Sequence, residues 1–134
     1  MKSLSCICLA LVLLCLSTMP AYATPDSNEL SQIVNLTASL DQKYPAGSIR
    51  TAEQAESALK ESTATQVRLQ SWYERADKTC QGNFFVNNCL NEIKEQRRLY
   101  IVVLQRIALE AKALQRKLRI DQLDRDLAER QAKP

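Results

Sequence analysis

Residues 79–90 read TCQGNFFVNNCL, and this short segment decides the fold. It holds both phenylalanines of the chain and the last two of its five cysteines, Cys80 and Cys89. Glycine and asparagine within it favour a turn, whereas the long stretches on either side are rich in Ala, Leu, Gln, Glu, Lys and Arg, which favour helix. The segment therefore predicts the connection of an antiparallel helical hairpin.

Turn-forming residues divide the chain into three predicted helices. The first covers about residues 28–43 and ends before Pro45. The second covers about residues 51–79, and its opening Thr-Ala-Glu-Gln matches a capping box. The third covers about residues 88–131, with Asn87 or Asn88 as its expected cap. The chain is thus predicted to be all-α.

Mainly apolar residues, interrupted by Ser62, Gln66 and Arg97, recur at alternating three- and four-residue steps along both long helices, which is the period of one helix wrapping on another. In the second helix this inner row is Ala52, Ala55, Leu59, Ser62, Gln66, Leu69, Tyr73, Ala76 and Cys80. In the third helix it is Leu90, Ile93, Arg97, Tyr100, Leu104, Ile107, Ala111, Leu114 and Leu118. The two rows predict a coiled-coil-like hairpin, accompanied by a short N-terminal helix.

Such a hairpin places Cys80 and Cys89 opposite one another where the helices join. Axes 8–10 Å apart can bring the two α-carbons within the ~4.4–6.8 Å that a disulfide needs. We therefore expect one structural disulfide. A redox-active pair is the alternative, because Cys89 lies at a helix N-terminus, but eight intervening residues favour a structural bridge.

Phe84, Phe85 and Val86 admit two interpretations. The favoured one folds these side chains over the end of the seam, above Cys80, Cys89 and Leu90. The other turns a ring outward as a contact point for a partner or a membrane surface, since rigid aromatic side chains are common anchors.

The third helix is longer than the second, at about 65 Å against about 43 Å. The second helix should therefore end near the level of residue 117. After Leu118 the apolar stripe changes phase and continues as Ile120, Leu123 and Leu127. We expect this overhang to turn its new stripe toward the first helix or toward a second copy of the protein.

Ile101, Val102 and Val103 form, with Tyr100 and Leu104, a run of five apolar residues. Apolar side chains therefore surround the helix at this level, and one neighbouring helix cannot bury them all. Either the first helix packs here to make a three-helix bundle, or these residues form an oligomer or client-binding surface.

Basic residues make a stripe on the third helix. Lys112, Arg116 and Arg119 repeat at four and three residues, with Arg97 and Arg98 further toward its N-terminus. The stripe can meet anionic lipid headgroups or an acidic protein, although a solvated outer face is the simpler interpretation.

Residues 1–23 have the three parts of a secretory signal: Lys2, an apolar run, and small residues up to Ala23. We expect cleavage after Ala23, which leaves residues 24–134 as a single helical domain. A membrane anchor is less consistent, because the apolar run is shorter than the ~20 residues that span a bilayer. We expect a periplasmic protein, with an extracellular location also open. Nucleic acid is not an expected partner there.

The hairpin segment also resembles an uncharacterised family of small exported helical proteins of Gram-negative proteobacteria. The resemblance covers about residues 72–125 and implies export and a helical build, with no known activity. The residues that carry it are Cys80, Phe85, Val86, Asn87, Cys89 and Leu90, followed by Arg97 and Arg98. The apolar residues 100–103 depart from the family's pattern, in which charged residues are more usual.

Composition argues against catalysis. The chain has no histidine and only two glycines, which removes the commonest general base and any glycine-rich phosphate loop. We expect no cofactor, no metal and no enzymatic activity.

The favoured hypothesis is a protein that acts through protein–protein interaction, by self-association or as an adaptor. A holdase-like chaperone is the alternative, and a thiol oxidoreductase using Cys80 and Cys89 is a third.

Overall fold

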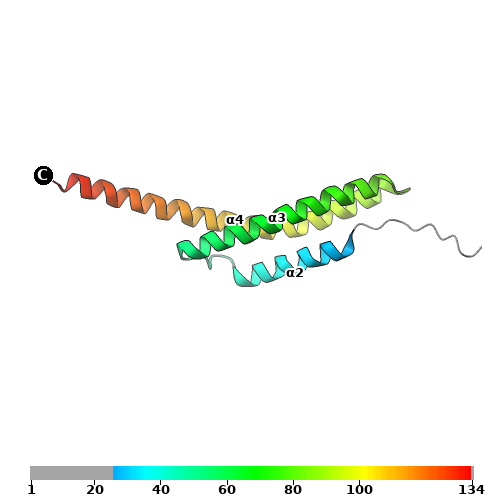
Figure 1. Cartoon of the computed structure of the whole chain (residues 1–134), viewed down its shortest axis with the longest axis horizontal. Helices are drawn as coiled ribbons and strands as arrows, with labels where there is room; N and C mark the ends of the chain where they lie inside the picture. The colour runs from blue at the N-terminus through cyan, green and yellow to red at the C-terminus, as the bar shows by residue number, and fades with distance from the viewer. Residues whose placement is uncertain (1–25, 134) are drawn as a thin grey trace, which may run out of the picture.

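The computed structural model describes residues 26–133 and contains three helices in that range (Figure 1). They are α2 (Ser27–Lys43), α3 (Ala52–Gln81) and α4 (Val86–Gln131). Each boundary lies within two residues of the predicted one, so the all-α prediction is confirmed. The predicted signal peptide, residues 1–23, lies outside the described residues.

The start of α3 follows the sequence closely, whereas the start of α4 does not. The Thr51 side chain accepts a hydrogen bond from the Gln54 amide, and the Gln54 side chain accepts one from the Thr51 amide, which completes the predicted capping box. The expected cap of α4 at Asn87 or Asn88 is wrong. The helix begins earlier, at Val86, and its N-cap residue Phe85 makes no side-chain hydrogen bond.

The core lies along the seam between α3 and α4 and extends under α2. Its fully buried large side chains include Ile33 from α2, Leu69 and Trp72 from α3, and Leu104 and Ile107 from α4. Trp72 is not in the predicted inner row, because α3 buries two rows. One row faces α4. The other row, which contains Ala58, Thr65 and Trp72, widens the buried face of α3.

α2 packs on the middle of the hairpin, antiparallel to α3. At its N-terminal end, the Trp72 indole N–H donates to the backbone oxygen of Asp26 at 3.2 Å. At its C-terminal end, Lys43 forms an ion pair with Glu61 at 2.8 Å. The hairpin therefore becomes a three-helix bundle over this stretch. A three-helix bundle was one of the two alternatives that the apolar run at residues 100–104 predicted.

The last part of α4 extends past the N-terminal end of α3 as a single helix (Figure 1). We call residues 115–131 the overhang. Ala111 is the last buried residue of α4, and Leu114 is the last that packs against the core. The expected end of the hairpin near residue 117 is thus correct to about one turn. The expectation that the first helix covers the overhang is wrong, because the 17 residues of α2 span only about 25 Å and lie along the hairpin.

Candidate functional site

A disulfide joins the two helices at the tip of the hairpin. Cys80 and Cys89 are bonded, with their α-carbons 5.5 Å apart, as predicted. Cys80 is fully buried and Cys89 is half-buried, and Asn83 Nδ2 lies 3.6 Å from the sulfur of Cys89. The full burial of Cys80 is compatible with the structural bridge that the sequence favours.

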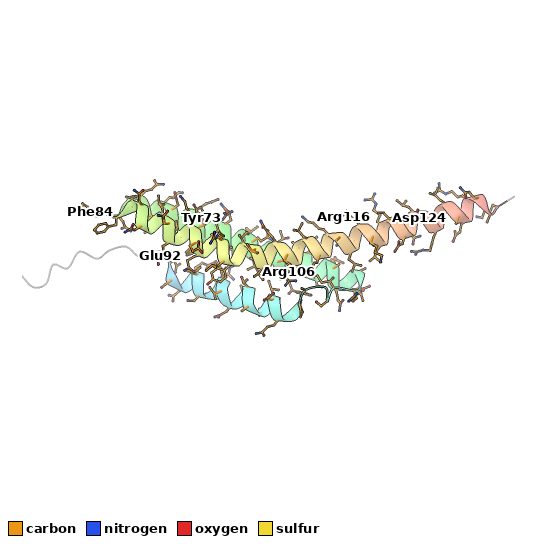
Figure 2. The ribbon with its side chains drawn as sticks, turned by 180° about the vertical axis from the view of Figure 1, so that it is seen from behind. Tyr73, Phe84, Glu92, Arg106, Arg116 and Asp124 are labelled. Carbon is orange, nitrogen blue, oxygen red and sulfur yellow. A yellow bond between two sulfur atoms is a disulfide. The ribbon has the colours of Figure 1, made fainter. Side chains whose placement is uncertain are left out.

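The two phenylalanines belong to the connection, and Phe84 lies at the outermost end of the hairpin (Figure 2). Phe84 is 87% exposed and Phe85 is 64% exposed, and their rings meet edge to face with centroids 5.0 Å apart. The favoured prediction that the two rings fold over the seam is wrong, whereas Val86, which the same prediction includes, is half-buried. Because α4 already begins at Val86, only residues 82–85 connect the helices, and this link is too short to turn both rings back.

The predicted partner surface at residues 101–103 is divided by the bundle. Ile101 and Val103 are partly buried and pack against the core. Only Val102 is exposed, at 60%. The three side chains therefore do not form one open patch.

A different apolar surface runs along the outside of α4, and we call it the outer ridge. At 100° per residue its members fall within an arc of about 120° that lies roughly opposite the buried face of the helix. Each is between 52% and 62% exposed. They are Leu99, Val102, Leu109, Ile120, Leu123 and Leu127.

The outer ridge has the spacing of a second coiled-coil seam. Its members occupy positions a and d of a seven-residue repeat that has Ile120 at position a. Between them, Arg106 and Ala113 occupy a positions and Arg116 occupies a d position. The ridge begins on the outward face of α4 within the bundle and continues onto the overhang. The sequence predicts only two separate parts of the ridge, Val102 and the stripe after Leu118. The seven-residue spacing that continues from one part to the other is the signal that could have shown them to be one surface.

The predicted basic patch is also divided. Lys112, Arg116 and Arg119 are exposed, and Arg116 lies clear of α2 and α3 (Figure 2). Arg97 is half-buried instead. Its Nε donates to Gln70 at 3.1 Å, and its guanidinium lies 5.3 Å from the centre of the Tyr73 ring. Arg98 is exposed and pairs with Glu95 on its own helix.

Arg106 joins α2 to α4, a role that no pattern in the sequence indicated. It forms ion pairs with Asp41 at 2.8 Å and with Glu110 at 3.0 Å, and it donates to the backbone oxygen of Tyr44 at 2.9 Å. Partial burial opposes its charge, but the hydrogen bonds to Glu110 and Asp41 outweigh burial and raise the pKa of Arg106. Glu110 in turn accepts from the Gly47 amide at 2.9 Å.

A groove of about 270 Å³ lies where α2 meets the tip half of the hairpin, and Leu30, Trp72, Cys89 and Glu92 are among its lining residues. Its walls are mainly apolar, and two carboxylates, those of Asp26 and Glu92, also line it. Across residues 26–133, no three Cys, Asp or Glu side chains are placed to share a metal ion. Nor is any helix in that range long and apolar enough to cross a membrane.

Comparison of the chain with models of protein families, with curated proteins and with solved structures finds no match.

Proposed function

We propose that the protein is non-enzymatic and works by binding another polypeptide chain through the outer ridge of α4. The observation that carries this proposal is the exposure of six large apolar side chains in heptad spacing on one helix face. An amphipathic helix recognises another helix through such a row, because each apolar side chain inserts between residues of the facing helix. Exposed apolar surface of this extent commonly marks an interaction site.

The bundle supports this role by holding the first half of the ridge in place. Trp72, the disulfide and the Arg106 ion pairs fix α2, α3 and the first half of α4 as one unit. The outward face of α4 is thereby displayed on a rigid support, and binding loses little side-chain and backbone entropy there.

We also propose that the protein is exported to the periplasm or the extracellular space. The Cys80–Cys89 disulfide supports this location, since disulfides persist in oxidising compartments and are rare in the cytosol. The resemblance to small exported proteins of Gram-negative proteobacteria points the same way.

Site-specific photo-crosslinking in the producing cell tests the binding role. A benzophenone amino acid is placed at Val102 or Leu123 on the ridge, and at the exposed Thr63 of α3 as the matched control. The ridge positions should each give a discrete protein adduct that Thr63 does not give. Equal labelling at all three positions, or no adduct from the ridge, contradicts the proposal.

A holdase-like chaperone is the second candidate, favoured by the exposed rings of Phe84 and Phe85. They form a second apolar surface at the opposite end of α4 from the overhang, and unfolded clients bind to such separated apolar patches. The protein should then slow the aggregation of a denatured model client, and Phe84→Ser/Phe85→Ser should weaken that effect. An unchanged aggregation rate removes this candidate.

A further inference from the structure

Most of the charges of the overhang fall in two blocks of opposite sign, and Glu129 and Arg130 follow them. Residues 116–119 contain three cations, Arg116, Lys117 and Arg119. Residues 121–126 contain the carboxylates of Asp121, Asp124 and Asp126, together with the single cation Arg125. Between and beside them lie the ridge residues Ile120, Leu123 and Leu127, each more than half exposed.

These charges have no ion-pair partners within the described chain. All five ion pairs among residues 26–133 involve residues up to Glu110, and none lies on the overhang. Arg116 and Asp124 lie along the overhang, away from α2 and α3 (Figure 2). Asp126 accepts a hydrogen bond from the Gln122 side chain at 2.8 Å, which leaves its negative charge unpaired. The charges of both blocks are therefore available to a molecule that approaches the outer ridge.

We infer that this molecule is a second copy of the chain, bound antiparallel to the first, overhang against overhang. The inference rests on the proposed function and names its partner. When the two helices are centred between Asp121 and Gln122, Ile120 of each copy faces Leu123 of the other. The ridge of one copy then packs against the same ridge of the other copy about a two-fold axis.

The same register matches the charge blocks. In the heptad that has Ile120 at position a, Lys117 and Asp124 are both at position e, and Arg119 and Asp126 are both at position g. Antiparallel helices pair e with e and g with g. Lys117 of one copy therefore faces Asp124 of the other, and Arg119 faces Asp126, so the two-fold axis generates four ion pairs.

The parallel arrangement has less of this complementarity. It pairs position g with position e of the next heptad, which brings Arg119 near Asp124 but Lys112 near Lys117. It also places Arg116 against Arg116 at a core position. Like charges held together at an interface select against that orientation. Charge pattern therefore favours the antiparallel pair.

The bundle leaves room for the second copy. In this register the pairing covers about residues 113–130, a length of about 27 Å. The second copy lies on the outer face of α4, whereas α2 and α3 lie on the inner face. The two bundles then point away from one another at opposite ends of a long rod. So short a seam should give a weak dimer that depends on protein concentration.

Charge reversal in two complementary variants tests the pairing by analytical ultracentrifugation of the purified protein with its disulfide intact. Lys117→Glu/Arg119→Glu makes the overhang mainly acidic, and Asp124→Lys/Asp126→Lys makes it mainly basic. Each variant alone should dimerise about tenfold or more weakly than the unmodified protein, and an equimolar mixture of the two should recover the dimer. Lys60→Glu/Lys78→Glu, which makes the same change in charge on exposed positions of α3, should dimerise like the unmodified protein.

A spin label on Gln131→Cys reports the orientation. Antiparallel pairing separates the two labels by about 30 Å, whereas parallel pairing brings them within about 15 Å. The shorter distance overturns the inference, as does a dimer that both charge variants form with unchanged affinity. A protein that stays monomeric at every accessible concentration also overturns it. If ridge photo-crosslinks to a different protein persist in that case, the proposed function stands without the dimer.

Discussion

Arg106 of α4 reaches across the bundle to Asp41 of α2, with Nη2 and Oδ1 2.8 Å apart. The same guanidinium holds the Tyr44 carbonyl and Glu110, and Glu110 accepts from Gly47 in the loop between α2 and α3. One side chain thereby fixes the C-terminal end of α2 and the loop that follows it.

Arg106→Ala should loosen α2 from the hairpin. The substitution removes three hydrogen-bonded contacts from a partly buried guanidinium, and we expect it to lower the free energy of unfolding by about 1–3 kcal/mol. Arg106→Lys should recover only part of that loss, because an ammonium cannot reproduce the planar fork. Urea unfolding followed by circular dichroism measures both. Arg98→Ala, which breaks one exposed pair, is the control and should change stability little.

Trp72 is the only tryptophan of the chain, and it is 2% exposed beneath α2. Trp72→Ala should cost about 3–5 kcal/mol through the cavity it leaves. Trp72→Phe should cost less, since it keeps an aromatic ring and loses mainly the hydrogen bond to Asp26. A stability loss below about 1 kcal/mol for the alanine variant would mean that α2 contributes little to the core.

Cys80→Ala/Cys89→Ala should lower the free energy of unfolding by roughly 2–3 kcal/mol, because the bridge closes a short loop at the hairpin tip. Helix content in the absence of denaturant should be retained, since the seam below the tip remains. The measurement is a urea titration of both proteins under oxidising conditions. Equal midpoints would show that the bridge is dispensable for stability.

Phe84→Ser/Phe85→Ser should leave stability within about 0.5 kcal/mol of the unmodified protein, because both rings are exposed. Ile93→Ala, at a buried position near the tip, is the comparison and should cost about 2–5 kcal/mol. If the serine variant loses as much as the alanine variant, the rings pack against the hairpin.

Glu53 connects stability to pH at the start of α3. Hydrogen bonds from its own backbone amide and from Thr51 lower the pKa of Glu53 from its ordinary value of 4.5. A lowered pKa stabilises the fold above the unfolded value, and this contribution disappears as pH falls through the folded pKa. Glu53→Gln should therefore lower Tm at pH 7, and the difference from the unmodified protein should disappear once the pH lies below the folded pKa. A difference that persists at about pH 2 would point to a contribution independent of charge.

The hairpin could be predicted from sequence because its determinants are local. Helix formers, the Thr51 capping box and the spacing of Cys80 and Cys89 act within a few residues of where they appear. The inner rows follow from the heptad period alone. Each of these features is visible without knowing what lies across the bundle.

Features that depend on distant residues could not be predicted. The position of α2 rests on Trp72 and Arg106, whose partners lie 46 and 62 or more residues away in the chain. The exposed rings of Phe84 and Phe85 follow from the early start of α4 at Val86, where no capping side chain marks the boundary. The outer ridge depends on which face of α4 the bundle leaves open, so sequence alone indicated only its separate pieces.

The overhang has backbone hydrogen bonds but no neighbouring helix to protect them. Only local pairs such as Gln122 with Asp126 support it, so its turns should open far more often than those of the bundle. Its amides should therefore exchange with solvent deuterium early, while those beside Leu69 and Leu104 exchange late. Any partner that binds the overhang, whatever its identity, should appear as slowed exchange confined to this end of α4, and the same stretch should be the first that a protease shortens when no partner is bound.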